Sequence, residues 1–385
     1  MKEDFGRQAI IDFDLLDENI ELVKKNIINN AGIIAVLKGD AYGHGLRAMA
    51  KEISKNRNVS MLAVSSLEEA RAICDTNKDI LILYPVVFFT IRKMANDKCN
   101  TEKNRDALKN KFIFSISNMN EYEMFCELSK ETGICFRVHL RLDFQSGVKG
   151  FTKKDYLNIK DRIFEEKGIN VCGIYAHLCS AYSDDYACTQ KELEEYDEVI
   201  ADIPSKIRKR LMVHLLTSAS FERFKDYQYD AVRVGTVLYG LPSNAPSDKD
   251  RKCIMKIYAN IVNIVDVANA SSVDYSGALD KSIKRVALVP VGRWDIPHFF
   301  LGEKCSVKVA GHLTKVAGSP CMDTCCIDVT GLMDVKVGDE VYFLDNESEI
   351  SFDDKIKENH FDVTSCEMIF AGISRLPKIY IRSEN

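Results

Sequence analysis

One lysine stands at the end of an apolar run, immediately before a glycine-rich loop. Residues 35–45 read Ala-Val-Leu-Lys-Gly-Asp-Ala-Tyr-Gly-His-Gly, so that Lys38 precedes Tyr42 by four positions. A lysine amine can form a Schiff base with an aldehyde, and a tyrosine hydroxyl beside backbone amides suits a phosphate. Pyridoxal 5′-phosphate carries both groups. The segment therefore predicts that Lys38 holds this cofactor covalently and that Tyr42 contacts its phosphate.

Two other interpretations of the segment are weaker. A nucleotide-binding P-loop would end in Gly-Lys-Ser/Thr, whereas here the lysine precedes the glycines. A solvent-facing lysine at the end of a strand is the usual fate of this residue type, and it remains the alternative for Lys38 taken alone.

The composition is that of a large globular protein. The chain has 385 residues, 46% of them hydrophobic and 28% charged, with a formal net charge of −5. This length suits two domains, and the lack of a long basic block argues against nucleic-acid binding. The longest apolar run, residues 80–89, is too short to span a bilayer and contains a proline. We expect a cytoplasmic protein without a membrane partner.

The 13 cysteines are scattered and contain no C-x-x-C pair. Without export signals, most of them are expected to be reduced, buried thiols. Cys321, Cys325 and Cys326 cluster, but His312 lies at the wrong spacing for a zinc finger. We predict no metal.

The elements that must position the lysine alternate regularly over the first 240 residues. Apolar runs predict eight strands near residues 33–38, 61–64, 80–83, 112–116, 134–142, 171–176, 212–216 and 231–233. Two intervening helices have start signals, Ser66 with Glu69 and Asn118 with Glu121. Strand followed by helix, repeated eight times, predicts an α/β fold with an N-terminal (β/α)8 barrel over residues 1–240.

A second domain is predicted over residues 241–385. After Tyr-Gly-Leu-Pro at 239–242, a polar linker leads into β-branched runs near residues 261–267, 286–290, 306–309 and 341–344. Turn signals at Gly338-Asp339 and Asp345-Asn346 separate such runs. This pattern predicts a mainly antiparallel β domain.

The lysine segment closely resembles the cofactor-lysine motif of the alanine racemase family, in which a valine-rich strand ends in lysine and Ala-Tyr-Gly-His-Gly follows. The resemblance covers essentially the whole chain, including the order of barrel and β domain. It implies a fold-type III enzyme that depends on pyridoxal phosphate, with Lys38 as one catalytic base.

Further candidates follow the later barrel strands, where the chemistry of such barrels is located. Ser218, Gly235 and Thr236 stand in loops that commonly bind phosphate through hydroxyls and backbone amides. His177, in Gly-Ile-Tyr-Ala-His, matches the family's histidine that packs against the cofactor ring, although a structural histidine is the alternative. Arg233 resembles the family's arginine that faces the pyridine nitrogen. Because arginine keeps its proton, it would disfavour protonation of that nitrogen.

Racemisation needs a base on each face of Cα, and the resemblance implies Tyr275 as the second one. Val-Asp-Tyr-Ser-Gly at 273–277 is similar to the family's Val-Ser-Tyr-Gly. A tyrosine in a β domain is ordinarily a packing residue. The family forms a head-to-tail homodimer, so Tyr275 would reach the partner's barrel, helped by a hydrogen-bond chain through His177 and Arg233. Met322-Asp323 matches a motif whose backbone meets the substrate carboxylate from the partner subunit.

Several positions depart from the family pattern. The family's Lys-x-Asp-Thr-Gly-Met-Gly-Arg-Leu-Gly appears here at residues 141–150. The arginine that meets the cofactor's phenolic oxygen and the substrate is Val148, with Lys149 as the nearest substitute. The lysine that is carbamylated in the family is Arg141, which forms no carbamate.

Two further departures concern the mouth of the site and the phosphate. The family's Gly-Tyr-Ala-Asp-Gly, whose tyrosine narrows the opening, reads Gly-Arg-Trp-Asp-Ile from residue 292, so Arg293 places a cation there beside Trp294. The family's phosphate-binding tyrosine is Cys366. Losing one charge-assisted hydrogen bond to a dianion costs on the order of 1.5–3 kcal/mol.

The sequence thus favours an amino-acid racemase that acts on alanine or another small or polar amino acid. A decarboxylase on the same scaffold is one alternative, because a reoriented substrate would break a different bond. A non-catalytic cofactor-binding homologue is the other. Retention of Lys38 and Tyr275 favours catalysis.

Overall fold

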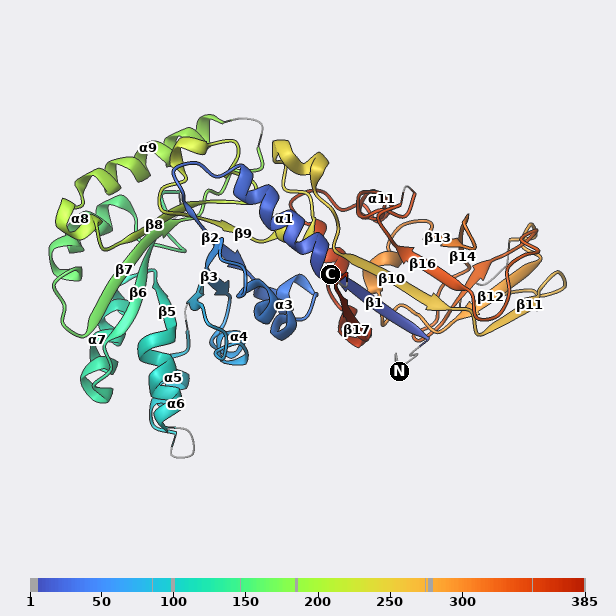
Figure 1. The fold of residues 1–385 in the computed structure, drawn as a ribbon, viewed down its shortest axis with the longest axis horizontal. Coiled ribbons are helices and arrows are strands. Elements are labelled where there is room, and N and C mark those ends of the chain that lie inside the picture. The colour runs from blue at the N-terminus through green and yellow to red at the C-terminus, as the bar shows by residue number, and fades with distance from the viewer. Residues whose placement is uncertain are drawn as a thin grey trace.

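The computed structural model describes residues 6–84, 86–97, 101–145, 147–183, 186–273, 275, 280–347 and 349–383. A barrel surrounded by helices forms one end of the molecule, and an extended β region forms the other (Figure 1). No helix of the described segments is long and apolar enough to cross a membrane.

The predicted eight-stranded barrel is confirmed. Its strands are parallel, and β2 closes the ring by pairing with β9. They are β2 (Gly32–Val36), β3 (Val59–Val64), β4 (Asp79–Ile82), β5 (Phe112–Ile116), β6 (Phe136–Leu142), β7 (Ile169–Ala176), β8 (Met212–Thr217) and β9 (Ala231–Val234). Helices cover the outside of the ring and side chains fill its centre, so these strands are near-continuous apolar runs. That is why they were recognisable in the sequence.

Some of the helices around the barrel begin at side chains that satisfy their first backbone N–H groups. Ser66 accepts from Glu69 N and Asn118 accepts from Glu121 N, as predicted. The helices are α1 (Phe13–Lys25), α2 (Lys38–Tyr42), α3 (Leu46–Ile53), α4 (Leu67–Ala72), α5 (Phe88–Ala95), α6 (Thr101–Asp106), α7 (Met119–Thr132), α8 (Lys153–Ile163), α9 (Ala187–Asp202), α10 (Ser205–Arg208) and, after the barrel, α11 (Phe352–Glu358).

The second part is a nine-stranded, mainly antiparallel sheet, as predicted. Its order is β11-β12-β15-β14-β13-β16-β10-β1-β17. The strands are β1 (Arg7–Asp12), β10 (Met255–Asn260), β11 (Asn263–Asp266), β12 (Arg285–Val289), β13 (Ser306–Val309), β14 (His312–Ala317), β15 (Cys325–Asp328), β16 (Glu340–Leu344) and β17 (Lys378–Ile381).

The two ends of the chain meet in this sheet. β1 pairs antiparallel with β10, with Arg7 opposite Ala259, and parallel with β17, with Ile11 opposite Tyr380. The first strand of the chain therefore lies in the β region rather than in the barrel. This pairing brings the C-terminal strand beside the segment that carries Lys38, where Tyr380 contacts His44.

A buried asparagine ties the first helix to the linker between the two parts. The Asn19 side chain, 1% exposed, donates to Leu238 O and to Lys252 O and accepts from Lys252 N. A buried amide with three such bonds is well satisfied, and it fixes the path of the chain as it leaves the barrel.

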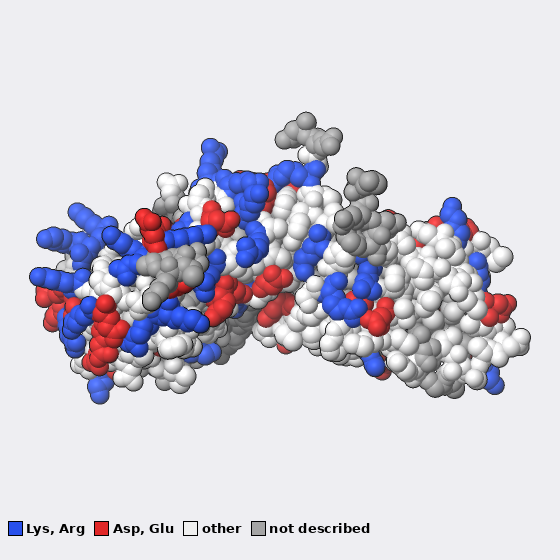
Figure 2. All heavy atoms as spheres, turned by 90° about the horizontal axis from the view of Figure 1, so that it is seen from below, with Lys and Arg blue, Asp and Glu red and all other residues white. Residues whose placement is uncertain are grey.

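Charged side chains of both signs crowd the barrel end of one face, whereas few lie over its β end (Figure 2).

Candidate active site

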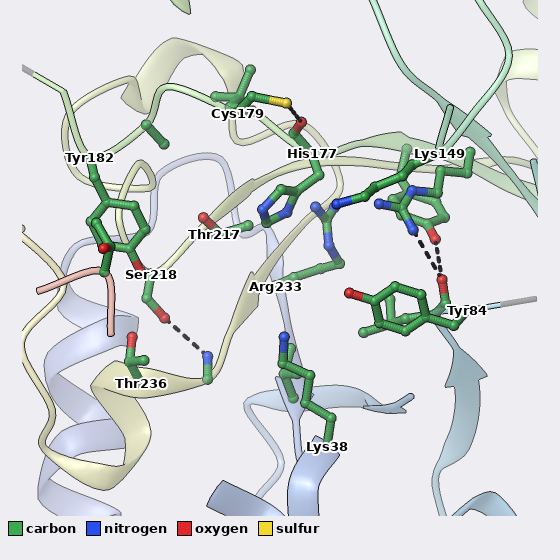
Figure 3. A pocket seen from close by; sticks show the side chains of 18 of the residues that line it. Lys38, Tyr84, Lys149, His177, Cys179, Tyr182, Thr217, Ser218, Arg233 and Thr236 are labelled. Atoms are coloured by element: carbon green, nitrogen blue, oxygen red, sulfur yellow. Dashed lines mark hydrogen bonds between the residues drawn. The ribbon is translucent and has the colours of Figure 1, made fainter. Parts of the chain in front are cut away.

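A cavity of about 260 Å³ opens at the C-terminal ends of the barrel strands. All seven residues predicted to bind the cofactor line it, namely Lys38, Tyr42, His177, Ser218, Arg233, Gly235 and Thr236. In Figure 3, Ser218 and Thr236 lie on one side of this barrel cavity and Lys149 and Tyr84 on the other, with Lys38 and His177 between them. The barrel thus gathers side chains that are up to about 200 positions apart in the sequence.

Lys38 begins a short left-handed turn. The φ angles of Gly39, Asp40, Ala41 and Tyr42 are 65°, 55°, 54° and 54°, with ψ near 45° for the first three. L-residues avoid this region at a cost of roughly 1–2 kcal/mol each, so the surrounding structure must hold the turn. The turn places the Lys38 and Tyr42 side chains in the same cavity.

Contacts from three directions hold the turn. Glu69 accepts from Gly39 N at 2.8 Å, and Asp40 Oδ1 accepts from Leu46 N at 2.8 Å. The buried His44 ring donates through Nδ1 to Ala41 O and Tyr42 O. The Tyr380 hydroxyl, from the C-terminal strand β17, donates to His44 O at 3.0 Å. The lysine segment therefore depends on the pairing of the chain ends.

The residues predicted to bind phosphate lie together on one side of the cavity, called the phosphate side below. Ser218 Oγ accepts from Gly235 N at 3.0 Å, and the Tyr42 hydroxyl lies so close to Gly235 that a Cβ there would come within 2.6 Å of it. Thr236 Oγ1 is buried and has no hydrogen-bond partner among the described residues. Burial raises the pKa of Tyr42, which therefore stays a hydrogen-bond donor. An orphaned hydroxyl in a glycine-lined recess fits a phosphate group.

Tyr182 stands at the same side and was not predicted from the sequence. It lines the cavity, and its side chain lies next to Ser218 and Thr236 in Figure 3. Burial first, and then the nearby Cys366 and Glu367, raise its pKa to about 12. Cys366 itself is fully buried and does not line the cavity, because its thiol donates to Pro242 O and Val363 O.

Arg233 is held by four protein acceptors. Its guanidinium donates to His214 Nδ1 at 2.8 Å and to the backbone oxygens of His214, Ala176 and Leu215. Because arginine can only donate, His214 Nδ1 must be the acceptor of this bond. The proton of the neutral His214 ring is therefore on Nε2, which donates to His139 Nδ1 at 2.9 Å. Burial and Arg233 hold the pKa of His214 well below its usual value, which keeps this ring neutral. The sequence analysis missed both histidines, which stand on the barrel strands β8 and β6.

His177 faces the cavity, and its predicted link to Arg233 is not present. Among the described residues no hydrogen bond joins these two side chains, because Arg233 is occupied by His214 and by backbone oxygens. His177 is an exposed residue that lines the cavity, and desolvation, followed by the charges of Arg233 and Arg141, lowers its pKa to about 3. His177 is therefore a neutral ring at the centre of a positive region.

The wall formed by the end of β6 differs from the phosphate side. Arg141 is 8% exposed and lies between the rings of Tyr84 and Tyr175, 5.6 Å and 5.9 Å from their centroids. Lys149 is exposed and lines the same cavity, whereas Val148 is 80% exposed and does not. Lys149, the expected substitute for the family's arginine, therefore lies at the cavity, beside Arg141.

The remaining predicted site residues lie in the β region and do not line the cavity of their own chain. Tyr275 is 67% exposed and Met322 45% exposed. The Arg293 guanidinium lies 5.3 Å from the centre of the Tyr275 ring, and Trp294 N donates to Met322 O. Asp323 forms an ion pair with Arg375 at 2.8 Å. These side chains form one exposed cluster, the arrangement that a contribution to a partner's site requires.

No group of three or more histidine, cysteine, aspartate or glutamate side chains is arranged to hold a metal within the described ranges.

The chain consists of a TIM-type barrel, with a lysine at the mouth of the barrel, followed by an antiparallel β region. This combination defines its fold class, and the comparison with known families agrees with it. The chain matches the N-terminal domain of alanine racemase over residues 11–243 and the C-terminal domain over residues 254–380. The chain is therefore a member of the alanine racemase family. Members of this family typically use pyridoxal 5′-phosphate.

The relatives are distant but match over nearly their whole length. The chain is 26% identical to the alanine racemase of Borreliella burgdorferi (strain ZS7), with 93% of this chain and 94% of that protein covered. It is 29% identical to that of Clostridium kluyveri, with 97% and 93% covered. Its fold is similar to alanine racemase from Clostridium difficile 630, with a TM-score of 0.85 at 24% identity and 100% and 98% of the chains covered.

Proposed function

We propose that this chain is a pyridoxal-phosphate-dependent amino-acid racemase that interconverts the enantiomers of alanine or of another small or polar amino acid. The observation that carries the proposal is that Lys38 shares one cavity with a recess for phosphate, whose Thr236 hydroxyl is buried without a partner. Pyridoxal 5′-phosphate, when bound, supplies an electron sink that acidifies the substrate's Cα proton.

The cavity residues have separate roles in this proposal. The Lys38 amine would hold the cofactor covalently. Tyr42, Ser218, Gly235 and Thr236 would bind its phosphate. Tyr182, the hydroxyl next to them, would supply the hydrogen bond that Cys366 cannot. Arg233 would donate to the pyridine nitrogen, and His214 keeps its guanidinium oriented.

Proton exchange requires one base on each face of Cα. The Lys38 amine, once released from the cofactor, would remove or return the proton on one face. On the other face, the partner subunit's Tyr275 would do so, in a head-to-tail homodimer in the cytoplasm. In this arrangement residues 1–240, apart from the strand β1 that joins the β sheet, form the cofactor domain, and residues 241–385 contribute to the partner's site through Tyr275, Met322 and Asp323.

The direct test is proton NMR of L- and D-amino acids in heavy water with the cofactor-loaded protein. Loss of the Cα signal together with appearance of the opposite enantiomer supports racemisation and names the substrate. The Lys38→Ala variant should lose both. Tyr275→Phe should lose exchange starting from one enantiomer, and exchange that is intact in both directions would remove Tyr275 from the mechanism.

Mixing two inactive variants tests the assignment across subunits. A heterodimer of Lys38→Ala and Tyr275→Phe chains contains one site with both residues intact and one with neither. A random mixture should therefore recover roughly a quarter of the wild-type activity. If both residues act within the same chain, the mixture stays inactive.

Decarboxylation is a second candidate because Val148 replaces a substrate-contacting arginine and lies outside the cavity. Formation of the amine in the same NMR experiment would favour this candidate over racemisation.

A further inference from the structure

The two buried arginines of the cavity differ in how the protein satisfies them. Arg233 donates to four acceptors, two through Nη1 and two through Nη2, so both of its terminal nitrogens are engaged. Arg141 donates only to Leu83 O, at 3.3 Å, and its buried Nε has no partner among the described residues. A guanidinium carries five N–H donors, and leaving such a charge buried and unpaired is costly. Arg141 is therefore available to an anionic ligand.

A second cation stands on the same wall. Lys149 lines the cavity, and its ammonium group points inward toward His177 and Arg233 in Figure 3. No carboxylate of the described residues lies within ion-pair distance of either Arg141 or Lys149. Both cations line the cavity together with His177.

The acidic residues of the cavity are engaged elsewhere. Asp143 accepts the backbone N–H groups of Gln145 and Lys149 and so shapes the loop after β6. Glu367 lies toward the phosphate side, where its charge raises the pKa of Tyr42 and Tyr182. Among the described residues, neither carboxylate forms an ion pair with Arg141 or Lys149, so both cations keep donors for a ligand.

We propose that the natural substrate is an amino acid with a second carboxylate, bound through its α-carboxylate by Arg141 and through its side-chain carboxylate by Lys149. This inference rests on the proposed function and narrows it. An alanine carries one carboxylate and pairs with only one cation of the wall. A dicarboxylic amino acid pairs with both through charge-assisted hydrogen bonds. Arg293, in the exposed cluster with Tyr275, adds a cation on the path of an acidic substrate if the head-to-tail dimer forms.

The test measures binding of unreactive carboxylates to the cofactor-loaded protein by isothermal titration calorimetry. Propanoate carries one carboxylate, and succinate and glutarate carry two. We expect at least one dicarboxylate to bind on the order of tenfold more tightly than propanoate. Lys149→Gln should abolish this advantage, so that propanoate and the dicarboxylates bind this variant with similar affinity. Lys149 is exposed, so its replacement does not endanger the fold.

The matched control is Lys154→Gln, which makes the same change of charge five positions along the chain at an exposed residue that does not line the cavity. It should keep the dicarboxylate preference. Equal affinity for propanoate and the dicarboxylates, or a preference that survives Lys149→Gln, overturns the inference.

The same samples separate this inference from the proposed function. Heavy-water exchange of L- and D-aspartate and glutamate, faster than that of alanine, supports both. Exchange of alanine without any dicarboxylate preference leaves the racemase proposal standing and removes the substrate assignment. A protein that binds dicarboxylates but exchanges no amino acid retains the two-cation site and loses the racemase function.

Discussion

The hydroxyl of Tyr42 lies directly against Gly235, at a point where a single added carbon would come within 2.6 Å of its oxygen. The two residues are 193 positions apart in sequence, since one follows the first barrel strand and the other the last. Their contact joins the lysine segment to the recess proposed for phosphate. Contacts between residues that are far apart in the sequence therefore build this site.

Gly235→Ala should weaken binding of pyridoxal phosphate. A Cβ at Gly235 would come within 2.6 Å of the Tyr42 hydroxyl oxygen, so the expected effect is steric. The new methyl group would push the Tyr42 hydroxyl out of the recess, and losing one hydrogen bond to a charged phosphate corresponds to roughly tenfold or more in affinity. Equilibrium dialysis with absorbance detection measures the change. Affinity equal to that of the wild type would contradict the assignment of this recess to phosphate.

Tyr182→Phe should also weaken cofactor binding by about tenfold, because the variant loses one donor to a dianion and keeps the ring. Tyr156→Phe is the matched control. It removes a hydroxyl that is buried and has no partner in the described part of the chain, away from the cavity. If both variants bind the cofactor as the wild type does, Tyr182 does not compensate for Cys366.

Tyr380→Phe should loosen the left-handed turn that carries Lys38. The lost hydrogen bond to His44 O costs about 1 kcal/mol in the free energy of unfolding, and the turn would then hold Lys38 less firmly. We expect a lower urea midpoint together with weaker cofactor binding. Tyr342→Phe, which removes a hydroxyl donating to Glu340 in the same sheet, should leave cofactor binding unchanged. If Tyr380→Phe lowers the urea midpoint but leaves cofactor binding unchanged, the C-terminal strand does not help to position Lys38.

Acid should destabilise the protein through three buried histidines. Burial lowers the pKa of His44 to about 4 and that of His139 to about 3, and it holds the pKa of His214 well below its usual value. An unfolded chain protonates these rings near pH 6.5, so it binds more protons than the native state below that pH. Their contribution to stability is therefore complete above about pH 6.5 and is lost as the pH falls toward about 4.

Each such histidine lowers the free energy of unfolding by roughly 1.4 kcal/mol per pH unit within that window. Urea unfolding followed from neutral to mildly acidic pH measures this slope. A urea midpoint that does not change across the window would mean that these rings accept protons in the folded protein.

Local patterns in the sequence determined much of the fold. The barrel strands were recognisable because a strand that is buried on both sides must be apolar along its whole length. Ser66 and Asn118 marked helix starts because capping involves residues only three positions apart. Lys38 and its glycine-rich loop were identified for the same reason, because the residues that suit the cofactor there are consecutive in the sequence.

Tertiary structure alone decided the rest. The left-handed turn at Asp40 and Ala41 depends on Tyr380, which is 336 positions from the residue that it contacts. The link from Arg233 to His214, in place of the expected one to His177, follows from which side chains neighbouring barrel strands turn inward. Arg141 was recognised in the sequence as a replaced residue, but only its unsatisfied guanidinium in the folded cavity marks it as a ligand-binding group. A buried polar group's role depends on its partners, and those partners are brought together only when the chain folds.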